Sequence, residues 1–117
     1  MPHVNYVEFN VGDVEASRKF YKEVFDWDPQ PWGGDDYLVA SHGDEPGIDT
    51  GITESPDGEP ITVAVITVDD IDGYLAKALV AGGDILVPKF HIEGVGHAAY
   101  VADTNGLMIG LHQPSGD

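Results

Sequence analysis

The sequence predicts an α+β fold in which two tandem βαβββ modules form a curved sheet around a shared cleft. Two observations favour this fold. Each half of the chain contains one helix-length amphipathic segment, preceded by one strand-length apolar segment and followed by three. In addition, residues 10–15 and 67–72 share the pattern polar, Val, any residue, Asp, β-branched, acidic at the same strand-to-helix junction, 57 residues apart. A duplication of about half the chain explains both, with modules at 1–56 and 57–117 of a single domain.

The first module begins with a loosely alternating apolar strand at residues 4–11. Asp13 is a good helix N-cap, and apolar residues then recur at helical spacing, which predicts a helix over 14–25. Residues 28–34 contain two prolines and predict an edge strand or a loop. Short strands are expected at 37–41 and 48–53.

The second module follows the most linker-like stretch, residues 55–60, which holds turn formers and no apolar residue. A β-branched strand is expected at 61–68. Either Asp69 or Asp70 can cap the next helix, which ends at Gly82 and Gly83. The remaining strands are expected at 85–87, 97–102 and 107–111, with a hairpin turn at 103–106.

Composition excludes several classes of function. The chain has 117 residues, no cysteine, and 21 acidic against 5 basic side chains, for a formal net charge of −16. Without cysteine there is no disulfide, thiolate metal site or cysteine nucleophile. Such an acidic surface repels phosphate backbones and anionic lipids, so we expect neither nucleic acid nor membrane as a partner. We expect a cytoplasmic protein and hypothesise a high-salt, halophilic cytoplasm, because salt would screen the self-repulsion.

Several local motifs of the chain are those of a known family, and they lie at residues 11–16, 20–25 and 99–106. Through them the chain resembles the vicinal oxygen chelate superfamily, which includes glyoxalase I, bleomycin resistance proteins and extradiol dioxygenases. Residues 32–34, 46–49, 87–89 and 94–96 are similar to a glyoxalase-like subgroup. The resemblance covers the whole chain and implies a small-molecule ligand between the modules and a homodimer.

Catalytic members of the superfamily hold one divalent metal with ligands on the first, fourth, fifth and eighth strands. By this resemblance the first-strand ligand position is Tyr6, the fifth-strand position Val63 and the eighth-strand position Gly110. The fourth-strand position lies within residues 48–54. Val and Gly have no side-chain donor, so the sequence predicts that the usual metal site is absent and that no cofactor is bound.

Other side chains could line the cleft. Glu8 shares the strand face of Tyr6 and could act as a general base, or could be an ordinary solvated or hydrogen-bonded glutamate. His112 shares the alternating face of Gly110, and His97 precedes Asp103 by six residues, where relatives often place a ligand-contacting residue. Both histidines could equally be half-buried strand residues. The predicted cleft comprises Tyr6, Glu8, Val63, His97, Gly110 and His112.

Two functions remain open at this point. The first is binding of a small organic molecule without the family metal, by sequestration or by acid–base chemistry at Glu8 or a histidine. The alternative is a metal-dependent lyase or isomerase like lactoylglutathione lyase, or a dioxygenase, with non-standard ligands such as His97, His112 and Glu8. A third possibility is that side chains close the cleft and that the domain serves only as a dimer or interaction module.

Overall fold

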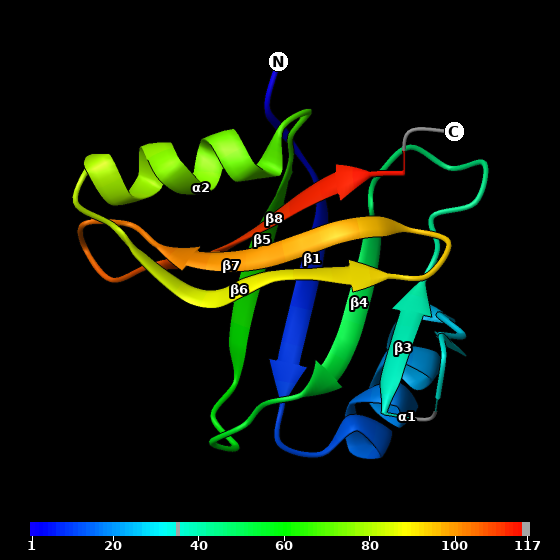
Figure 1. Cartoon of the computed structure of the whole chain (residues 1–117). Coiled ribbons are helices and arrows are strands. Elements are labelled where there is room, and N and C mark those ends of the chain that lie inside the picture. The colour runs from blue at the N-terminus through cyan, green and yellow to red at the C-terminus, as the bar shows by residue number, and fades with distance from the viewer. Residues whose placement is uncertain (35, 116–117) are drawn as a thin grey trace. The chain divides into compact units, whose positions relative to one another are not determined.

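The computed structural model describes residues 1–34 and 36–115. Its elements follow the order expected for two βαβββ modules, and the α+β class is confirmed (Figure 1). The first set consists of β1 (His3–Val11), α1 (Val14–Phe25), β2 (Gln30–Pro31), β3 (Tyr37–Ala40) and β4 (Asp49–Glu54). The second consists of β5 (Ile61–Thr67), α2 (Ile71–Val80), β6 (Asp84–Ile92), β7 (Gly96–Ala102) and β8 (Met108–Pro114).

The described chain divides into two compact units, whose boundaries fall inside β1 and β5. The first-module unit covers residues 6–63. The second-module unit comprises residues 1–5 and the described residues from 64 onward. No helix in the described part of the chain is long and apolar enough to cross a membrane.

In the first-module unit the strands lie in the order β2-β3-β4-β1. β3 pairs with β4 in antiparallel fashion, whereas β1 pairs with β4 in parallel. The parallel register places Tyr6 beside Asp49 and Glu8 beside Gly51. Leu38 and Ile52, which are register partners on β3 and β4, are fully buried.

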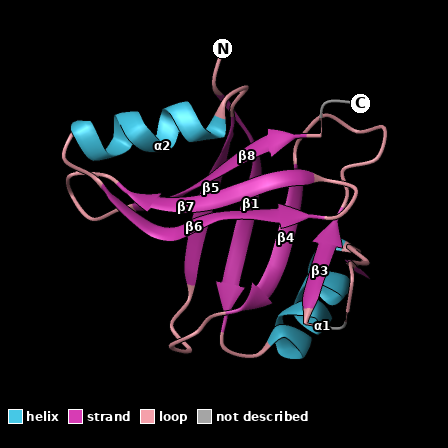
Figure 2. Cartoon of the chain, in the orientation of Figure 1, coloured by secondary structure: helices cyan, strands magenta, loops and turns pink. Residues whose placement is uncertain are grey.

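In the second-module unit the order is β5-β8-β7-β6, and α2 lies alongside this sheet (Figure 2). β5 and β8 are parallel, with Val65 beside Gly110. The core joins one face of α2 to the strands. A fully buried Val, Leu or Ile side chain contributes about 1.5–3 kcal/mol to the stability of a fold. The buried members of the core are Val68, Ile71, Leu75, Ala99, Val101 and Leu111.

Both helices begin where the sequence predicts. The side chain of Asp13 accepts the backbone N–H of Ala16 at 3.1 Å, and that of Asp70 accepts the backbone N–H of Gly73 at 3.2 Å. The structure therefore selects Asp70 over Asp69 as the cap of α2. These caps satisfy backbone donors that have no partner within the helix.

Two expectations about local structure are wrong. β6 is nine residues long, three times the predicted 85–87, and runs through Pro88. An edge strand tolerates proline, and register shifts between Ile85 and Phe90 relieve the lost pairing. The helical spacing of the aromatic residues of α1 favours a position in the core, but α1 has no buried residue. Phe20 and Phe25 are each more than half exposed, and their rings pack on one another and on Tyr21 and Trp27.

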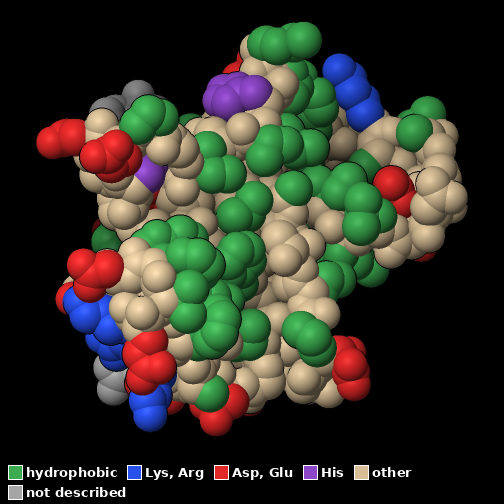
Figure 3. All heavy atoms as spheres, turned by 180° about the vertical axis from the view of Figure 1, so that it is seen from behind, with side chains coloured by type: hydrophobic (Ala, Val, Ile, Leu, Met, Phe, Trp, Pro, Cys, Tyr) green, Lys and Arg blue, Asp and Glu red, His purple; other side chains and the backbone are tan. Residues whose placement is uncertain are grey.

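Acidic side chains occur at separate places on the molecular surface, between apolar and uncharged ones (Figure 3). The carboxylates of Glu15, Asp26 and Asp72 form ion pairs with Arg18, Lys22 and Lys89. All three carboxylates are more than two thirds exposed, and surface pairs of this kind stabilise a fold by at most about 1 kcal/mol.

Candidate functional site

The strand registers identify the fourth-strand ligand position that the sequence left open. In the second-module unit, the eighth-strand position Gly110 lies beside Val65, two residues after the fifth-strand position Val63. In the first-module unit, the residue beside Glu8, two residues after Tyr6, is Gly51. The repeat therefore makes Gly51 the counterpart of Gly110.

The residues at the four family positions do not form a metal site. Gly51, Val63 and Gly110 have no side-chain donor atom, and Tyr6 supplies one phenol oxygen. A Cβ atom at Gly51 would collide with the hydroxyls of both Tyr6 and Tyr37, so a carboxylate side chain has no room there. A Cβ at Gly110 would lie 3.0 Å from a methyl carbon of Val65. These residues do not fit a divalent cation.

Instead, the hydroxyls of Tyr6 and Tyr37 occupy the space over Gly51. They belong to a hydrogen-bonded network that also includes Glu8 and Asn10. The hydroxyl of Tyr37 donates to Oε2 of Glu8 at 2.8 Å. The hydroxyls of Tyr6 and Tyr37 are 2.7 Å apart. Asn10 donates from Nδ2 to Oε1 of Glu8 at 3.4 Å, a long contact. β1 and β3 thus supply one continuous polar network, and Gly51 of β4 leaves the space it needs.

The members of this network differ in how far they are buried. Glu8 is 6% exposed and Asn10 8%, whereas Tyr6 and Tyr37 are only partly buried. The pKa of Tyr6 is raised to about 12, mainly by burial; the hydrogen bond with Tyr37 lowers this pKa, and the carboxylates of Glu8 and Asp49 raise it. Burial also raises the pKa of Tyr37, and so does the carboxylate of Glu8. Both phenols therefore stay protonated at neutral pH.

Sequence reasoning placed Tyr6 and Glu8 on one strand face but missed Tyr37 and Asn10. Asn10 continues the same alternation two residues after Glu8, so that signal was available. Tyr37 lies 29 residues from Glu8, and its role depends on how β3, β4 and β1 pair. No local pattern reveals this pairing.

The other predicted site residues lie in different surroundings. Val63 is fully buried, and Gly110 is buried beside Val65. His97 lies opposite Gln113 in the β7–β8 register, and His112 lies opposite Ala98. Adjacent strand residues alternate faces, so the two histidines point to opposite sides of the sheet. Gly110 shares the face of His112.

Each of these histidines has a neighbour in its own unit. His112 Nε2 lies 3.2 Å from the carbonyl oxygen of Val95. The ring of His97 lies 5.1 Å, centroid to centroid, from that of His91 on β6. Across residues 1–34 and 36–115, no three His, Asp or Glu side chains are arranged to hold a metal ion.

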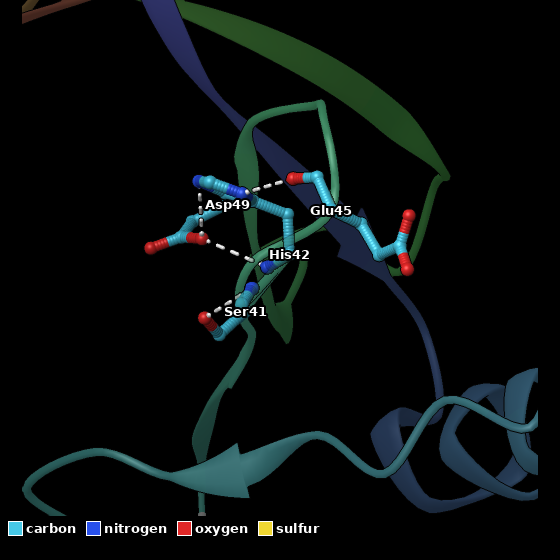
Figure 4. Close-up of polar contacts among 5 residues, drawn as sticks. Ser41, His42, Glu45 and Asp49 are labelled. Atoms are coloured by element: carbon cyan, nitrogen blue, oxygen red, sulfur yellow. Dashed lines mark hydrogen bonds and ion pairs between the residues drawn. The ribbon is translucent and has the colours of Figure 1, made fainter.

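His42 and Asp49 stabilise the loop that leads into β4 (Figure 4). The carboxylate of Asp49 accepts the backbone N–H of His42 at 3.1 Å and lies 3.6 Å from the Nε2 atom of the ring. The Nδ1 atom is 2.8 Å from the carbonyl oxygen of Glu45. The loop thus holds a carboxylate at the residue beside Tyr6 in the β1–β4 register.

An open pocket of about 410 Å³ lies in the second-module unit, and none of its lining residues is among the predicted site residues. The chain end, β5 and β8 supply its walls. Its lining residues are Met1, His3, Thr67, Val68, Asp69, Gln113 and Pro114.

The element order and the parallel pairings inside each module define a βαβββ-repeat protein of the glyoxalase fold class. The sequence profile of the Glyoxalase/Bleomycin resistance protein/Dioxygenase superfamily matches residues 3–111. The chain belongs to this superfamily, which confirms the resemblance.

Two curated mycobacterial relatives match over most of the chain. The proteins named "Putative glyoxylase CFP32" in Mycobacterium bovis and Mycobacterium tuberculosis are each 33% identical to it over 118 residues. The match covers 93% of this chain and 44% of the relative, so the chain spans less than half the length of these relatives.

Solved structures show the same fold at low sequence identity. The Mn(II)-bound glyoxalase from Novosphingobium aromaticivorans has a TM-score of 0.68 at 18% identity, covering 97% of this chain and 40% of that one. The hypothetical protein BH1468 from Bacillus halodurans has a TM-score of 0.69 at 13% identity, covering 99% and 96%. The methylmalonyl-CoA epimerase from Mycobacterium tuberculosis has a TM-score of 0.61 at 13% identity, covering 96% and 87%. These likenesses concern the fold alone.

Proposed function

We propose that this glyoxalase-superfamily domain binds a small organic molecule at the chain formed by Tyr6, Tyr37 and Glu8, and that it does so without the divalent metal of the catalytic members. The partly exposed phenols provide the ligand contact, and the buried carboxylate anchors them. Ligand sites commonly combine an apolar wall with a few fixed polar groups, and this network supplies such groups.

The observation that carries the proposal is which groups fill the space at Gly51. In this chain the fourth-strand ligand position has no side chain, and two tyrosine hydroxyls take up the space. A metal ligand and this polar network exclude each other at that point. The matching positions in the second module, residues 57–117, are apolar, because Val63 and Val65 stand where the first module has Tyr6 and Glu8. The pairing of a tyrosine with a glutamate on one strand face is therefore a feature of the first module.

The superfamily match and the name of the mycobacterial relatives favour an alternative, a metal-dependent lyase or isomerase of the glyoxalase kind. This alternative needs a ligand set other than the four family positions. It predicts stoichiometric Zn, Ni, Mn or Fe in the purified protein.

Elemental analysis combined with ligand-observed NMR separates the two functions. For the proposed function, the protein purified without chelator contains metal far below one equivalent, and a small aromatic alcohol such as benzyl alcohol shows saturable binding. Tyr6→Phe weakens this binding, whereas Tyr21→Phe, which deletes a hydroxyl elsewhere in the same unit, does not. Stoichiometric metal whose removal abolishes binding would instead support the alternative.

A further inference from the structure

The hydrogen bonds of the Tyr6–Tyr37–Glu8 chain have a fixed direction. As a carboxylate, Glu8 has no proton to give and can only accept. Tyr37 has one hydroxyl hydrogen, and the 2.8 Å contact directs it to Glu8. The 2.7 Å contact between the phenols must then use the hydrogen of Tyr6, donated to the oxygen of Tyr37.

This direction determines what Tyr6 can offer a ligand. Its only hydroxyl hydrogen already points to Tyr37, so its oxygen presents lone pairs. A ligand that also presents a lone pair, such as a carbonyl or carboxylate oxygen, would face acceptor against acceptor. A ligand with an O–H or N–H group completes the chain. While Glu8 is a carboxylate, this direction leaves Tyr6 without a hydrogen to donate to a ligand carbonyl.

The negative charge around Tyr6 also favours a ligand that donates a hydrogen bond. The carboxylates of Glu8 and Asp49 both act electrostatically on its hydroxyl. Asp49 is held at the end of the 41–48 loop by the backbone N–H of His42. Two carboxylates near one phenol oxygen disfavour an anionic ligand and favour a cation.

We propose that the site selects small organic molecules that present a hydrogen-bond donor, an alcohol or an ammonium group, to the oxygen of Tyr6, and that it discriminates against carbonyl and carboxylate groups. This inference rests on the proposed function and names its ligand class. Glu8 determines specificity indirectly, through Tyr37 and Tyr6, because it fixes the direction of two hydrogen bonds.

Four probes with the same benzyl or phenyl body test the proposal by titration at neutral pH. Benzyl alcohol against benzaldehyde isolates the direction of the hydrogen bond, since both are neutral. Benzylammonium against benzoate adds charge. An unsatisfied polar pairing costs about 1–3 kcal/mol, so we expect the donor probe of each pair to bind at least about fivefold more tightly.

The variant Glu8→Gln separates direction from mere packing, because it keeps the shape of the side chain. Asn10 still requires an acceptor on its side, which turns the new amide nitrogen toward Tyr37. That nitrogen donates to Tyr37, so Tyr37 can donate to Tyr6 and Tyr6 to a ligand. The preference for benzyl alcohol over benzaldehyde should fall at least about fivefold or reverse.

Two further variants complete the test. Tyr37→Phe disconnects Tyr6 from Glu8 and should abolish the preference, whereas Tyr21→Phe should leave it unchanged. A wild-type preference for benzaldehyde or benzoate, or an unchanged ratio in folded Glu8→Gln protein, would overturn the inference and leave the proposed function standing. Absence of saturable binding for all four probes would overturn the proposed function as well.

Discussion

The hydroxyl of Tyr37 donates to the carboxylate of Glu8 across 2.8 Å, although the two residues lie on strands that are not neighbours. Between them runs β4, and at the crossing point β4 carries Gly51. The hydrogen bond exists because that residue lacks a side chain. The network of Tyr6, Tyr37 and Glu8 therefore depends on a glycine at position 51, and each of these residues can be substituted separately.

Gly51→Ala tests whether the glycine is required by this network. The added methyl group collides with the hydroxyls of Tyr6 and Tyr37, and overpacking of this kind costs about 1–3 kcal/mol. Urea denaturation should show this loss of unfolding free energy. Gly34→Ala is the control, since its new methyl would meet only the flexible end of Asp36. Equal stability of the two variants would contradict the packing described here.

The tyrosines predict a dependence of stability on alkaline pH. Burial raises the folded-state pKa of Tyr6 from 10.0 to about 12, and that of Tyr37 is also raised. The unfolded state therefore ionises first, so this stability is fully present below pH 10 and is lost as pH rises toward 12. Ultraviolet titration should show Tyr6 and Tyr37, and so at least two of the five tyrosines, ionising late.

The double variant Tyr6→Phe, Tyr37→Phe serves as the control for this titration. Its stability should vary less between pH 10 and 12 than that of the wild type. If all five wild-type tyrosines ionise together near pH 10 while the protein is folded, the buried network is refuted.

The helix caps give a second prediction about stability. Asp13→Ala and Asp70→Ala each remove an acceptor for a backbone N–H in the first turn of a helix, at a cost of about 1 kcal/mol. Asp69→Ala changes the charge equally without touching the cap, and surface changes of that kind stay within about 0.5 kcal/mol. Chemical denaturation of the three variants measures the difference. A loss at Asp69 as large as that at Asp70 would reassign the cap.

The helices and the site differ in how far the sequence predicts them. α1 begins and ends at the predicted residues, Val14 and Phe25, because its cap and its apolar spacing are local. The extent of β6 was not predictable locally, since a strand tolerates Pro88 only at a sheet edge. Tyr6 was placed by the family resemblance, and Glu8 by alternation from Tyr6 along the same strand. Tyr37 was missed because its contact needs two strand registers that involve residues tens of positions apart.

The net charge of −16 leads to a proposal about solution conditions. We propose that self-repulsion among the carboxylates destabilises the fold in dilute buffer. At about 1 M salt the Debye length falls to about 3 Å, so such repulsion is screened. The thermal unfolding midpoint should then rise with KCl and rise less in sucrose of equal osmolality. A midpoint that does not change with KCl would contradict the proposal.

Binding of a small molecule at Tyr6, Tyr37 and Glu8 without a divalent metal can be tested directly by titrating the purified protein with benzylammonium before and after exhaustive treatment with a metal chelator. We expect the same affinity in both samples, and a loss of affinity in Tyr6→Phe under either condition. Binding that disappears with the chelator and returns on addition of Zn, Ni or Mn would contradict it.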